Sequence, residues 1–448
     1  MSATITTQPT TSRPADVPAW KRVVYSHKVL FIGLTLFLVL SFVRALAEGG
    51  DDLTSSKTVG STLRFTIPIL LAGLAGLWAE RVGVVNIGIE GMMIFGTWFG
   101  GVGAWKFGPW WGLVLAIIGG MLGGLIHATA TVTFNVNHII SGVAINLFAF
   151  YGMRYMSELL WSGRDAPQGS GISQSPQQKS PPARFDFPFL SGGKIGSWKS
   201  PDVLGWLECG GSRSSVPKCD EGWPVVGDMA GVLRGFTFNV HLITLLALLM
   251  VPLTTFVLWR TKFGLRVRSS GEAPAAAESL GVKVTSLRYR ALLISGGFAG
   301  FGGGYLAIVA SSYYRQGQTA NKGFIGLATM IAGNWRPTGV LASGFLFGYP
   351  EALNRVGREA LPQLFIFGAI VCAVWFGFAL LRRRWLASGV ALGLAVLLFV
   401  WWLRIDEIPE SLTGGLPYML TLIVLATASQ KLRPPAHAGQ PYRSGESH

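Results

Sequence analysis

The sequence predicts an all-α polytopic membrane protein with about 10 transmembrane helices plus a re-entrant or broken-helix hairpin. Three observations lead to this fold class. Half of the 448 residues are hydrophobic and only 13% are charged, a balance that a water-soluble domain of this length does not present to solvent. Apolar runs recur along almost the whole chain and leave one sizeable polar interval. The basic residues cluster in short segments beside those runs, as the positive-inside rule describes.

The net charge of +15 is also compatible with a protein that binds nucleic acid. However, lysine and arginine stand next to apolar segments, and this placement favours membrane topology over an electrostatic footprint for nucleic acid. We therefore expect one membrane domain with insertions, in contact with membrane lipid and with no nucleic acid.

Each predicted span is a mostly apolar segment of roughly 20 residues, because the hydrocarbon core is ~30 Å thick and each helical residue rises about 1.5 Å. The segments that qualify are Val29–Ala47, Ser61–Ala79, Ile87–Trp105, Pro109–Thr131, Ile139–Trp161, Phe238–Trp259, Ala291–Tyr313, Gln363–Leu381, Trp385–Leu403 and Leu416–Ser429. A further apolar stretch, Gly323–Leu353, is broken in its middle by the sequence NWRP at 334–337. The break predicts a hairpin of half-helices or short helices.

The distribution of lysine and arginine predicts the orientation, since short loops rich in these residues stay in the cytoplasm. Residues 1–28 contain Arg13, Lys21, Arg22 and Lys28, whereas the connection after the first span is acidic. Counting spans forward places both termini, residues 260–290 and Arg382–Arg384 in the cytoplasm. The count closes only if Gly323–Leu353 enters and leaves on the same side.

The expected organisation follows from these boundaries. It comprises a disordered cytoplasmic tail (1–28), transmembrane helices (29–161), an extracytoplasmic loop (162–236), further transmembrane helices with a cytoplasmic segment at 260–290 (237–429), and a cytoplasmic tail (430–448). The first span also imitates a signal peptide that ends at Ala45-Leu46-Ala47. Arg44 and the long polar region ahead of the span favour a retained helix.

Two of the three cysteines, Cys209 and Cys219, lie in the long polar loop, and Cys372 lies in a span. A disulfide between the first two is expected in an oxidising exterior, and two free thiols are the alternative. The loop has no histidine, so a structural zinc site, which wants four ligands, is not expected there.

The segment VGVVNIGIEG at 82–91 places an amide, Asn86, and a carboxylate, Glu90, at the edge of or inside an apolar segment. Burying an unpaired carboxylate in lipid costs about 3 kcal/mol on insertion scales, so Glu90 is expected to face protein, water or a partner. The glycines let the backbone depart from regular helix, or let another helix approach closely. A functional site is one interpretation. A glutamate that fixes orientation at the membrane interface is the other.

The segment FGLRVRSSGEAPAAAESLG at 263–281 combines basic residues, a capping-type start, an alanine-rich stretch and a glycine stop. It predicts a short amphipathic helix between two spans. Its small residues, Ala275, Ala276 and Ala277, suit insertion into a groove on a second protein.

Five blocks of sequence, taken together, carry a family resemblance. They are GVVNIGIEG (83–91), IISGVAINLFA (139–149), FGLRVRSSGEAPAAAESLGV (263–282), GFIGLATMIAGNWRPTGVLASGFLFGYPEAL (323–353) and LPYMLTLIVLA (416–426). In this order they resemble the permeases of the branched-chain amino acid, ribose and nucleoside class of ABC importers. The first two blocks look most like one of the two paired subunits of bacterial nucleoside importers.

That resemblance implies a permease subunit of an ATP-driven importer in the bacterial cell membrane, translocating nucleosides or related small solutes. The implied partners are a cytoplasmic ABC ATPase, a second homologous permease and an extracytoplasmic solute-binding lipoprotein. The chain has no Walker motif, so it is expected to bind no cofactor itself, and ATP is used by the partner subunit. The ATPase coupling helix would contain Gly271, Glu272, Ala275, Ala276, Ala277 and Gly281. Candidates for the solute path are Asn86, Glu90, Asn146 and Asn334, each of which is alternatively a helix-packing residue.

Other functions stay open at this point. Importers of ribose, other sugars or branched-chain amino acids share the architecture. An ion-coupled secondary transporter needs ionisable residues inside spans, and Glu90 and Glu158 are nearly the only acidic candidates. A membrane enzyme is disfavoured because the six histidines show no HExxH or other ligand spacing. The chain departs from the family pattern in its long outer loop, in two extra spans within Gln363–Leu403, and in its extended N-terminal tail.

Overall fold

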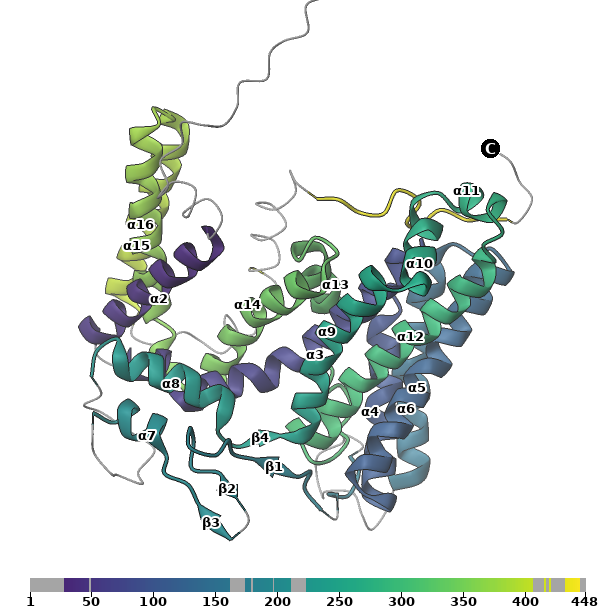
Figure 1. Cartoon of the computed structure of the whole chain (residues 1–448), viewed down its shortest axis with the longest axis horizontal. Coiled ribbons are helices and arrows are strands. Elements are labelled where there is room, and N and C mark those ends of the chain that lie inside the picture. Colours follow the sequence, from purple (N-terminus) through teal and green to yellow (C-terminus); the bar gives the residue numbers. More distant parts are fainter. Residues whose placement is uncertain are drawn as a thin grey trace, which may run out of the picture.

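A computed structural model describes residues 28–47, 50–161, 174–178, 180–195, 197–210, 223–405, 415, 419 and 432–443. Within these residues the chain is mostly helical, with four two-residue strands (Figure 1). The α-helices are α2 (Lys28–Leu46), α3 (Ser56–Arg81), α4 (Ile89–Phe107), α5 (Pro109–Ala128), α6 (His138–Trp161), α7 (Val203–Glu208), α8 (Val226–Thr237), α9 (Leu242–Arg260), α10 (Lys262–Glu272), α11 (Pro274–Ser279), α12 (Val284–Tyr305), α13 (Lys322–Ala332), α14 (Pro337–Val356), α15 (Gln363–Leu381) and α16 (Trp385–Arg404). The strands are β1 (Arg184–Phe185), β2 (Lys194–Ile195), β3 (Trp198–Lys199) and β4 (Val240–His241), and four short helical turns cover Gly50–Leu53, Thr129–Thr133, Leu306–Ala310 and Arg358–Ala360.

Seven helical segments among the described residues are long and apolar enough to cross a membrane. They are Ser56–Arg81, Pro109–Thr133, His138–Trp161, Leu242–Arg260, Val284–Ala310, Arg358–Leu381 and Trp385–Arg404, and each overlaps a predicted span. The predicted spans Val29–Ala47 and Ile87–Trp105 correspond to α2 and α4. The helix α2 has a shorter apolar part, Gly33–Leu46, and α4 contains many glycines together with Glu90 and Lys106. The predicted span Leu416–Ser429 lies outside the described residues except for Met419.

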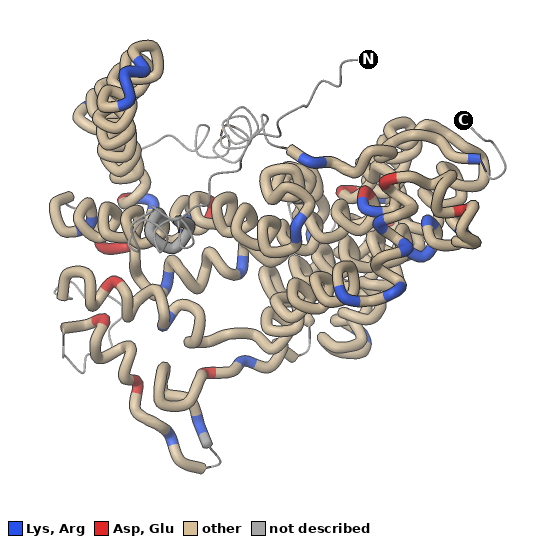
Figure 2. The backbone as a smooth tube through the Cα atoms, turned by 45° about the horizontal axis from the view of Figure 1, so that its top comes forward, with Lys and Arg blue, Asp and Glu red and all other residues tan. Residues whose placement is uncertain are grey.

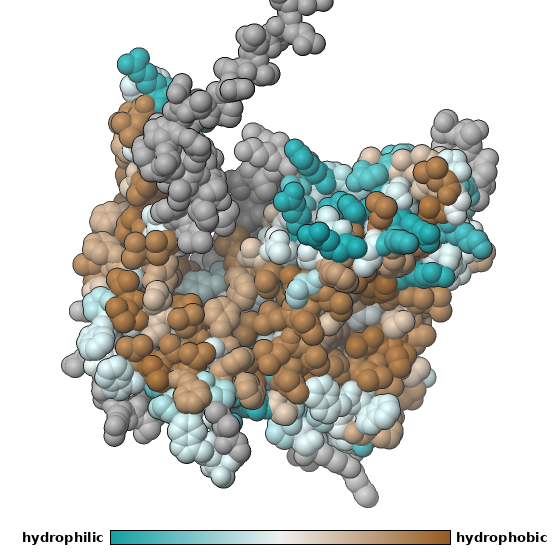
Figure 3. Space-filling model, viewed as in Figure 1, coloured by the Kyte–Doolittle hydropathy of each residue, from teal (hydrophilic) through white to brown (hydrophobic). Residues whose placement is uncertain are grey.

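The protein is therefore a helical, multi-pass membrane protein. Figure 3 shows hydrophobic residues over the middle of the molecule and hydrophilic residues over the end that carries α10 and α11. An apolar belt between polar ends is the surface that a bilayer requires, because unpaired polar groups are costly in hydrocarbon.

The core of the bundle is formed by α3 and α12, with α4 and α5 packed around them. Glycines allow the backbones of α5 and α12 to approach closely. A Cβ atom on Gly120 would lie 2.1 Å from the carbonyl oxygen of Gly296, and one on Gly300 would lie 2.3 Å from the carbonyl oxygen of Ala116. Small residues at such contacts give membrane helices their van der Waals packing.

The predicted break in Gly323–Leu353 is present. The helices α13 and α14 are separated by residues 333–336, and Asn334 and Trp335 both have a positive φ of 52°. Pro337 occupies the first position of α14, where its missing N–H and fixed φ are tolerated. Both helices pack against α3, where Gly326 lies against Ala72.

The α13–α14 hairpin enters and leaves at one end of the molecule. Before α13, the backbone N–H of Ser175 donates to the carbonyl of Tyr314 at 2.9 Å. After α14, Gly357 packs on Asp52, close to Ser56, whose N–H donates to the Glu208 carboxylate at 2.8 Å. The connection before α13 thus contacts the predicted extracytoplasmic loop directly, and the connection after α14 lies on the turn before α3, whose first residue binds the same loop. The turn between α13 and α14 reaches the opposite end, near α10.

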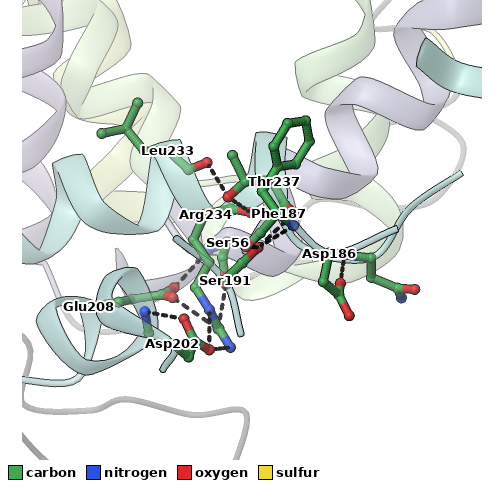
Figure 4. Close-up of polar contacts among 11 residues, drawn as sticks. Ser56, Asp186, Phe187, Ser191, Asp202, Glu208, Leu233, Arg234 and Thr237 are labelled. Carbon is green, nitrogen blue, oxygen red and sulfur yellow. Dashed lines mark hydrogen bonds and ion pairs between the residues drawn. The ribbon is translucent and has the colours of Figure 1, made fainter. Parts of the chain in front are cut away.

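The long loop is partly structured at the lower edge of Figure 1, where β1 pairs with β4 and β2 pairs with β3, both antiparallel. Figure 4 shows how Arg234 of α8 ties the loop together, with its guanidinium 2.8 Å from Asp202 and 3.2 Å from Glu208. Its Nη1 also donates to the hydroxyl of Ser56 in α3 at 3.3 Å. The loop is therefore anchored to the first core helix.

The helices α15 and α16 form an arm that stands away from the bundle, with α2 beside α15 (Figure 1). Their connection lies at the same end of the molecule as α10 and α11, and Figure 2 shows basic residues at both places. The basic residues of the arm tip are Arg382–Arg384. The two basic segments therefore lie at the same end of the molecule, and the side of the membrane that this end faces stays a prediction.

Candidate functional site

Glu90 lies in the first turn of α4 and binds the start of α13. Its carboxylate accepts the backbone N–H groups of Asn321 at 3.1 Å and Gly323 at 2.7 Å, and the residue is 6% exposed. The first N–H groups of a helix have no partner within the helix and carry partial positive charge, so a carboxylate is a favourable acceptor there. Glu90 is thus a paired, buried carboxylate that holds the half-helix α13 inside the bundle.

Lys322 brings a second buried charge to the same place. It is 5% exposed, and its Nζ lies 3.0 Å from Oε1 of Glu351 in α14. Arg355, which is largely exposed, lies 3.6 Å from the same oxygen. The ion pair joins the two helices of the hairpin next to Glu90. Lys322 and Glu351 were not predicted from the sequence as site residues, although a charge inside an apolar stretch is itself a signal of function.

Asn86 and Asn146 fix the segment that leads to Glu90. The Asn86 amide donates to the hydroxyl of Ser295 in α12 at 3.0 Å. Asn146 of α6 accepts from the N–H of Gly91 at 2.7 Å and donates to the carbonyl of Ile87 at 3.0 Å. Both amides therefore have packing roles here. The Oδ1 atom of Asn86 is buried and has no hydrogen-bond partner among the described residues.

Asn334, the fourth candidate, lies apart from the other three. Its Oδ1 accepts the backbone N–H of Arg433 at 2.8 Å, at the α10–α11 end of the molecule. Nearby, the indole N–H of Trp335 donates to Glu80 at 2.6 Å, and Arg81 donates to the carbonyl of Trp335 at 2.7 Å. The structure thus joins Asn86, Glu90 and Asn146 around the 82–91 segment and leaves Asn334 at the hairpin turn.

The predicted coupling segment forms two helices. The helix α10 ends at Glu272, Ala273 is non-helical, and α11 covers Pro274–Ser279. Gly271 is buried, and a Cβ atom there would lie 2.4 Å from the carbonyl oxygen of Arg81. Gly281 follows α11 with a φ of +80°, a conformation that favours glycine.

The exposed face of α11 differs from the predicted set of alanines. Ala277 is buried against the protein, whereas Ala275, Ala276 and Ser279 are exposed. Leu280 follows them and is 84% exposed. The surface offered to a partner is therefore small and apolar, with one large side chain at its end, and sequence reasoning missed Leu280.

The predicted disulfide falls partly outside the described residues. Cys209, at the end of α7, is disulfide-bonded, but Cys219 is not among the described residues. The pairing of these two cysteines stays a prediction. Cys372 in α15 is free. Within the described part of the chain, no group of three or more His, Cys, Asp or Glu residues is arranged to hold a metal ion.

Comparisons with known proteins agree on one family. Residues 58–375 match the model of "Branched-chain amino acid transport system / permease component". The guanosine ABC transporter permease protein NupQ of Bacillus subtilis is 31% identical over 67% of this chain and 83% of its own length. The nucleoside ABC transporter permease protein NupC of Lactococcus lactis is 30% identical over 74% of this chain and 95% of its own.

A third relative, from Haloferax volcanii, carries a provisional name for a glucose ABC transporter permease. It is 31% identical over 66% of this chain and 76% of its own length. No solved structure matches the chain significantly.

Proposed function

The chain belongs to the family of permease components of branched-chain amino acid transport systems, and on that premise we propose that it is the transmembrane permease subunit of an ATP-driven importer for nucleosides. The observation that carries the proposal is the likeness to two permeases named for guanosine and nucleoside transport, over most of their lengths. Two structural features also support it. The α13–α14 hairpin is suited to a solute path, and α11 is suited to contact an ATPase.

The solute path in this proposal passes the first turn of α13. Transporters place their sites where discontinuous helices end inside the bundle, because free backbone groups and helix dipoles are available there. In this chain the start of α13 is held by Glu90, and the Lys322–Glu351 pair lies next to it. The free Oδ1 of Asn86 could accept from a ribose hydroxyl or a base N–H. Asn146 acts on this path by holding Gly91 in place.

The contact with the ATPase in this proposal is α11 together with Leu280. Ala275 and Ala276 give a flat face, and Leu280 projects from it. A single large apolar residue surrounded by small ones fits a groove in a partner protein. ATP is bound and hydrolysed by that partner, whose closure moves α11 and opens the path alternately to each side.

The further partners are a second homologous permease and a solute-binding lipoprotein outside the cell. The end with α10 and α11 faces the cytoplasm of a bacterial cell in this proposal, together with both termini, because the basic segments gather there. Cysteines introduced at Arg315 and Arg358 would then both react with an impermeant thiol reagent from outside. Labelling of only one of them from outside would contradict the topology.

A sugar is the second candidate solute, favoured by the Haloferax volcanii relative. An ion-coupled transporter is less well supported, because the buried acids are already engaged. Glu80 accepts from Trp335, Glu90 from the α13 backbone, and Glu351 pairs with Lys322. A coupling ion would have to displace these partners.

A pair of exposed leucines tests the proposed ATPase contact. Leu280 is 84% exposed beside α11, and Leu381 is 86% exposed at the tip of the arm. Leu280→Ala and Ala276→Arg should both weaken the association of the permease with the ATPase. For Ala276→Arg we expect a loss of a few kcal/mol in binding free energy, which corresponds to an about hundredfold weaker affinity. Leu381→Ala is the matched control. Co-purification of the ATPase and nucleoside uptake are measured together. Wild-type retention and uptake in Leu280→Ala and Ala276→Arg would contradict the proposed contact.

A further inference from the structure

The C-terminal segment 432–443 lies across the α10–α11 end of the molecule, as the yellow trace in Figure 1 shows. It contains three prolines, at 434, 435 and 441, which disfavour helix and keep the chain extended. No apolar periodicity marks it in the sequence. Nevertheless its contacts reach several separate elements of the bundle.

Four backbone N–H groups of the segment donate hydrogen bonds to two turns and to the end of one helix. Arg433 donates to Oδ1 of Asn334 at 2.8 Å, in the turn between α13 and α14. His437 donates to the carbonyl of Gly271 at 3.0 Å, at the end of α10, and Gly439 donates to the carbonyl of Gly83 at 3.1 Å, in the turn between α3 and α4. Ala436 adds a bond to the carboxylate of Glu272 at 3.2 Å.

Tyr442 anchors the far end of the segment between α11 and α12. Its hydroxyl donates to the carboxylate of Glu278 in α11, and its ring lies 5.2 Å from the guanidinium carbon of Arg288. Arg288 is 1% exposed, and its Nε and Nη2 atoms have no hydrogen-bond partner among the described residues. The cation–π contact with Tyr442 is thus one of the few favourable interactions of this buried cation.

Burial and the hydrogen bond to Glu278 raise the pKa of Tyr442 to about 12. The phenol therefore stays protonated at physiological pH and remains a donor.

These contacts connect two places that the proposed function keeps apart. At one end are α10 and α11, which contact the ATPase in that proposal. The second place comprises two turns. One lies between α3 and α4, ahead of Asn86 and Glu90, and the other contains Asn334 and follows α13, whose start is bound by Glu90. A short segment that contains three prolines is stiff. Because it is bonded to α10, α11 and both turns, a movement of α10 and α11 can displace the turns.

We propose that residues 432–443 form a strap that transmits movement of α10 and α11 to the 82–91 segment and to the α13–α14 hairpin. The strap is a coupling element and is separate from the surface that docks the ATPase. The inference rests on the proposed function for the statement that α11 contacts an ATPase. It goes beyond that function by assigning a role to the C-terminal segment.

The test compares two truncations in the complete complex, reconstituted in proteoliposomes. A chain that ends at Lys431 lacks the strap, and a chain that ends at Arg443 keeps every contact described above. We expect both to retain the ATPase on purification. The shorter chain should transport at least about tenfold less nucleoside per ATP hydrolysed, within the range of ordinary coupling energies. The proposed strap would be refuted if both chains transported the same amount of nucleoside per ATP hydrolysed, or if the shorter chain failed to retain the ATPase.

A point variant tests the same proposal without truncation, in case the shortened chain misfolds. Tyr442→Ala removes the ring over Arg288 and the bond to Glu278, whereas Gln440→Ala changes an exposed side chain of the same segment. Tyr442→Ala should lower transport per ATP while Gln440→Ala leaves it unchanged, and identical behaviour would contradict the inference. If the wild-type complex shows no ATP-dependent uptake, the proposed function fails, which is distinguishable from a strap that is merely dispensable in a working transporter.

Discussion

The core helices and the arm share the length and composition of membrane spans but differ in what surrounds them. In the core, 89% of the apolar window of α3 lies inside the protein, whereas the corresponding values for the arm are 11% and 17%. The arm helices α15 and α16 are nonetheless the more apolar ones. Hydropathy therefore identifies segments that are apolar enough to cross a membrane, but it does not predict which of them are buried inside the bundle.

The surroundings of the glycines separate the two regions more clearly, because Gly296 and Gly300 of α12 have the same four-residue spacing as Gly389 and Gly393 of α16. In α12, Gly296 and Gly300 face backbone atoms of α5 at distances that no Cβ atom could keep. In the arm, a Cβ atom added at Gly377, Gly389 or Gly393 would meet no atom of the described residues within 4 Å. Glycine in the core thus allows close approach of helix backbones, whereas these three arm glycines have open surroundings and Gly368 meets only the side chain of Leu398 at 3.1 Å.

The largest expected effect comes from filling a core glycine. Gly300→Leu should destabilise the protein by more than about 3 kcal/mol, because the new side chain must push α5 away from α12. Gly393→Leu is the matched arm variant and should unfold at nearly the wild-type temperature. Thermal unfolding of the purified proteins in detergent measures both. Equal losses in the two variants would remove the distinction between core and arm.

The second effect concerns two cations that share one carboxylate. Lys322→Met leaves Glu351 without its buried partner and should cost about 3 kcal/mol, together with most of the uptake. Arg355→Met removes an exposed cation 3.6 Å from the same oxygen and should cost at most about 1 kcal/mol. Unfolding temperature and uptake are compared for the pair. A larger loss in Arg355→Met would show that burial does not set the strength of these contacts.

The smallest effect is expected at Glu158, the second acidic candidate for ion coupling. Its side chain is half exposed and 2.9 Å from Arg154 on the same face of α6. Exposed pairs of this spacing contribute about 0.3–0.5 kcal/mol, so Glu158→Gln should leave stability and uptake almost unchanged. A loss of uptake with normal stability would instead point to proton or ion coupling through this residue.

The sequence alone predicted the parts of the fold that depend on local composition. Apolar length located α3, α9 and the arm, and NWRP located the hairpin turn, because a proline cannot continue a helix and starts the next one well. It also identified Glu90, but the backbone groups that bind this carboxylate lie 231 and 233 residues away along the chain. Such pairings depend on helix packing, which leaves no local pattern.

Other features of the site could not be predicted from periodicity. The extended segment 432–443 has no apolar stripe, so its many contacts were invisible in the sequence. The alanines of α11 were predicted as one face, but in the six-residue helix that begins at Pro274 the side chain of Ala277 is buried, and Leu280 directly after the helix is exposed. The exact direction of such a short helix is set by its neighbours.

In the proposed function this chain moves nucleosides with energy from a partner ATPase. Uptake of radiolabelled guanosine is measured in proteoliposomes that contain this chain, its companion permease and the ATPase. The solute-binding lipoprotein is added on the side of the loop. We predict accumulation that requires ATP on the side of α10 and α11 and that persists when ion gradients are collapsed. Accumulation without ATP, driven by a proton or sodium gradient, would contradict the account.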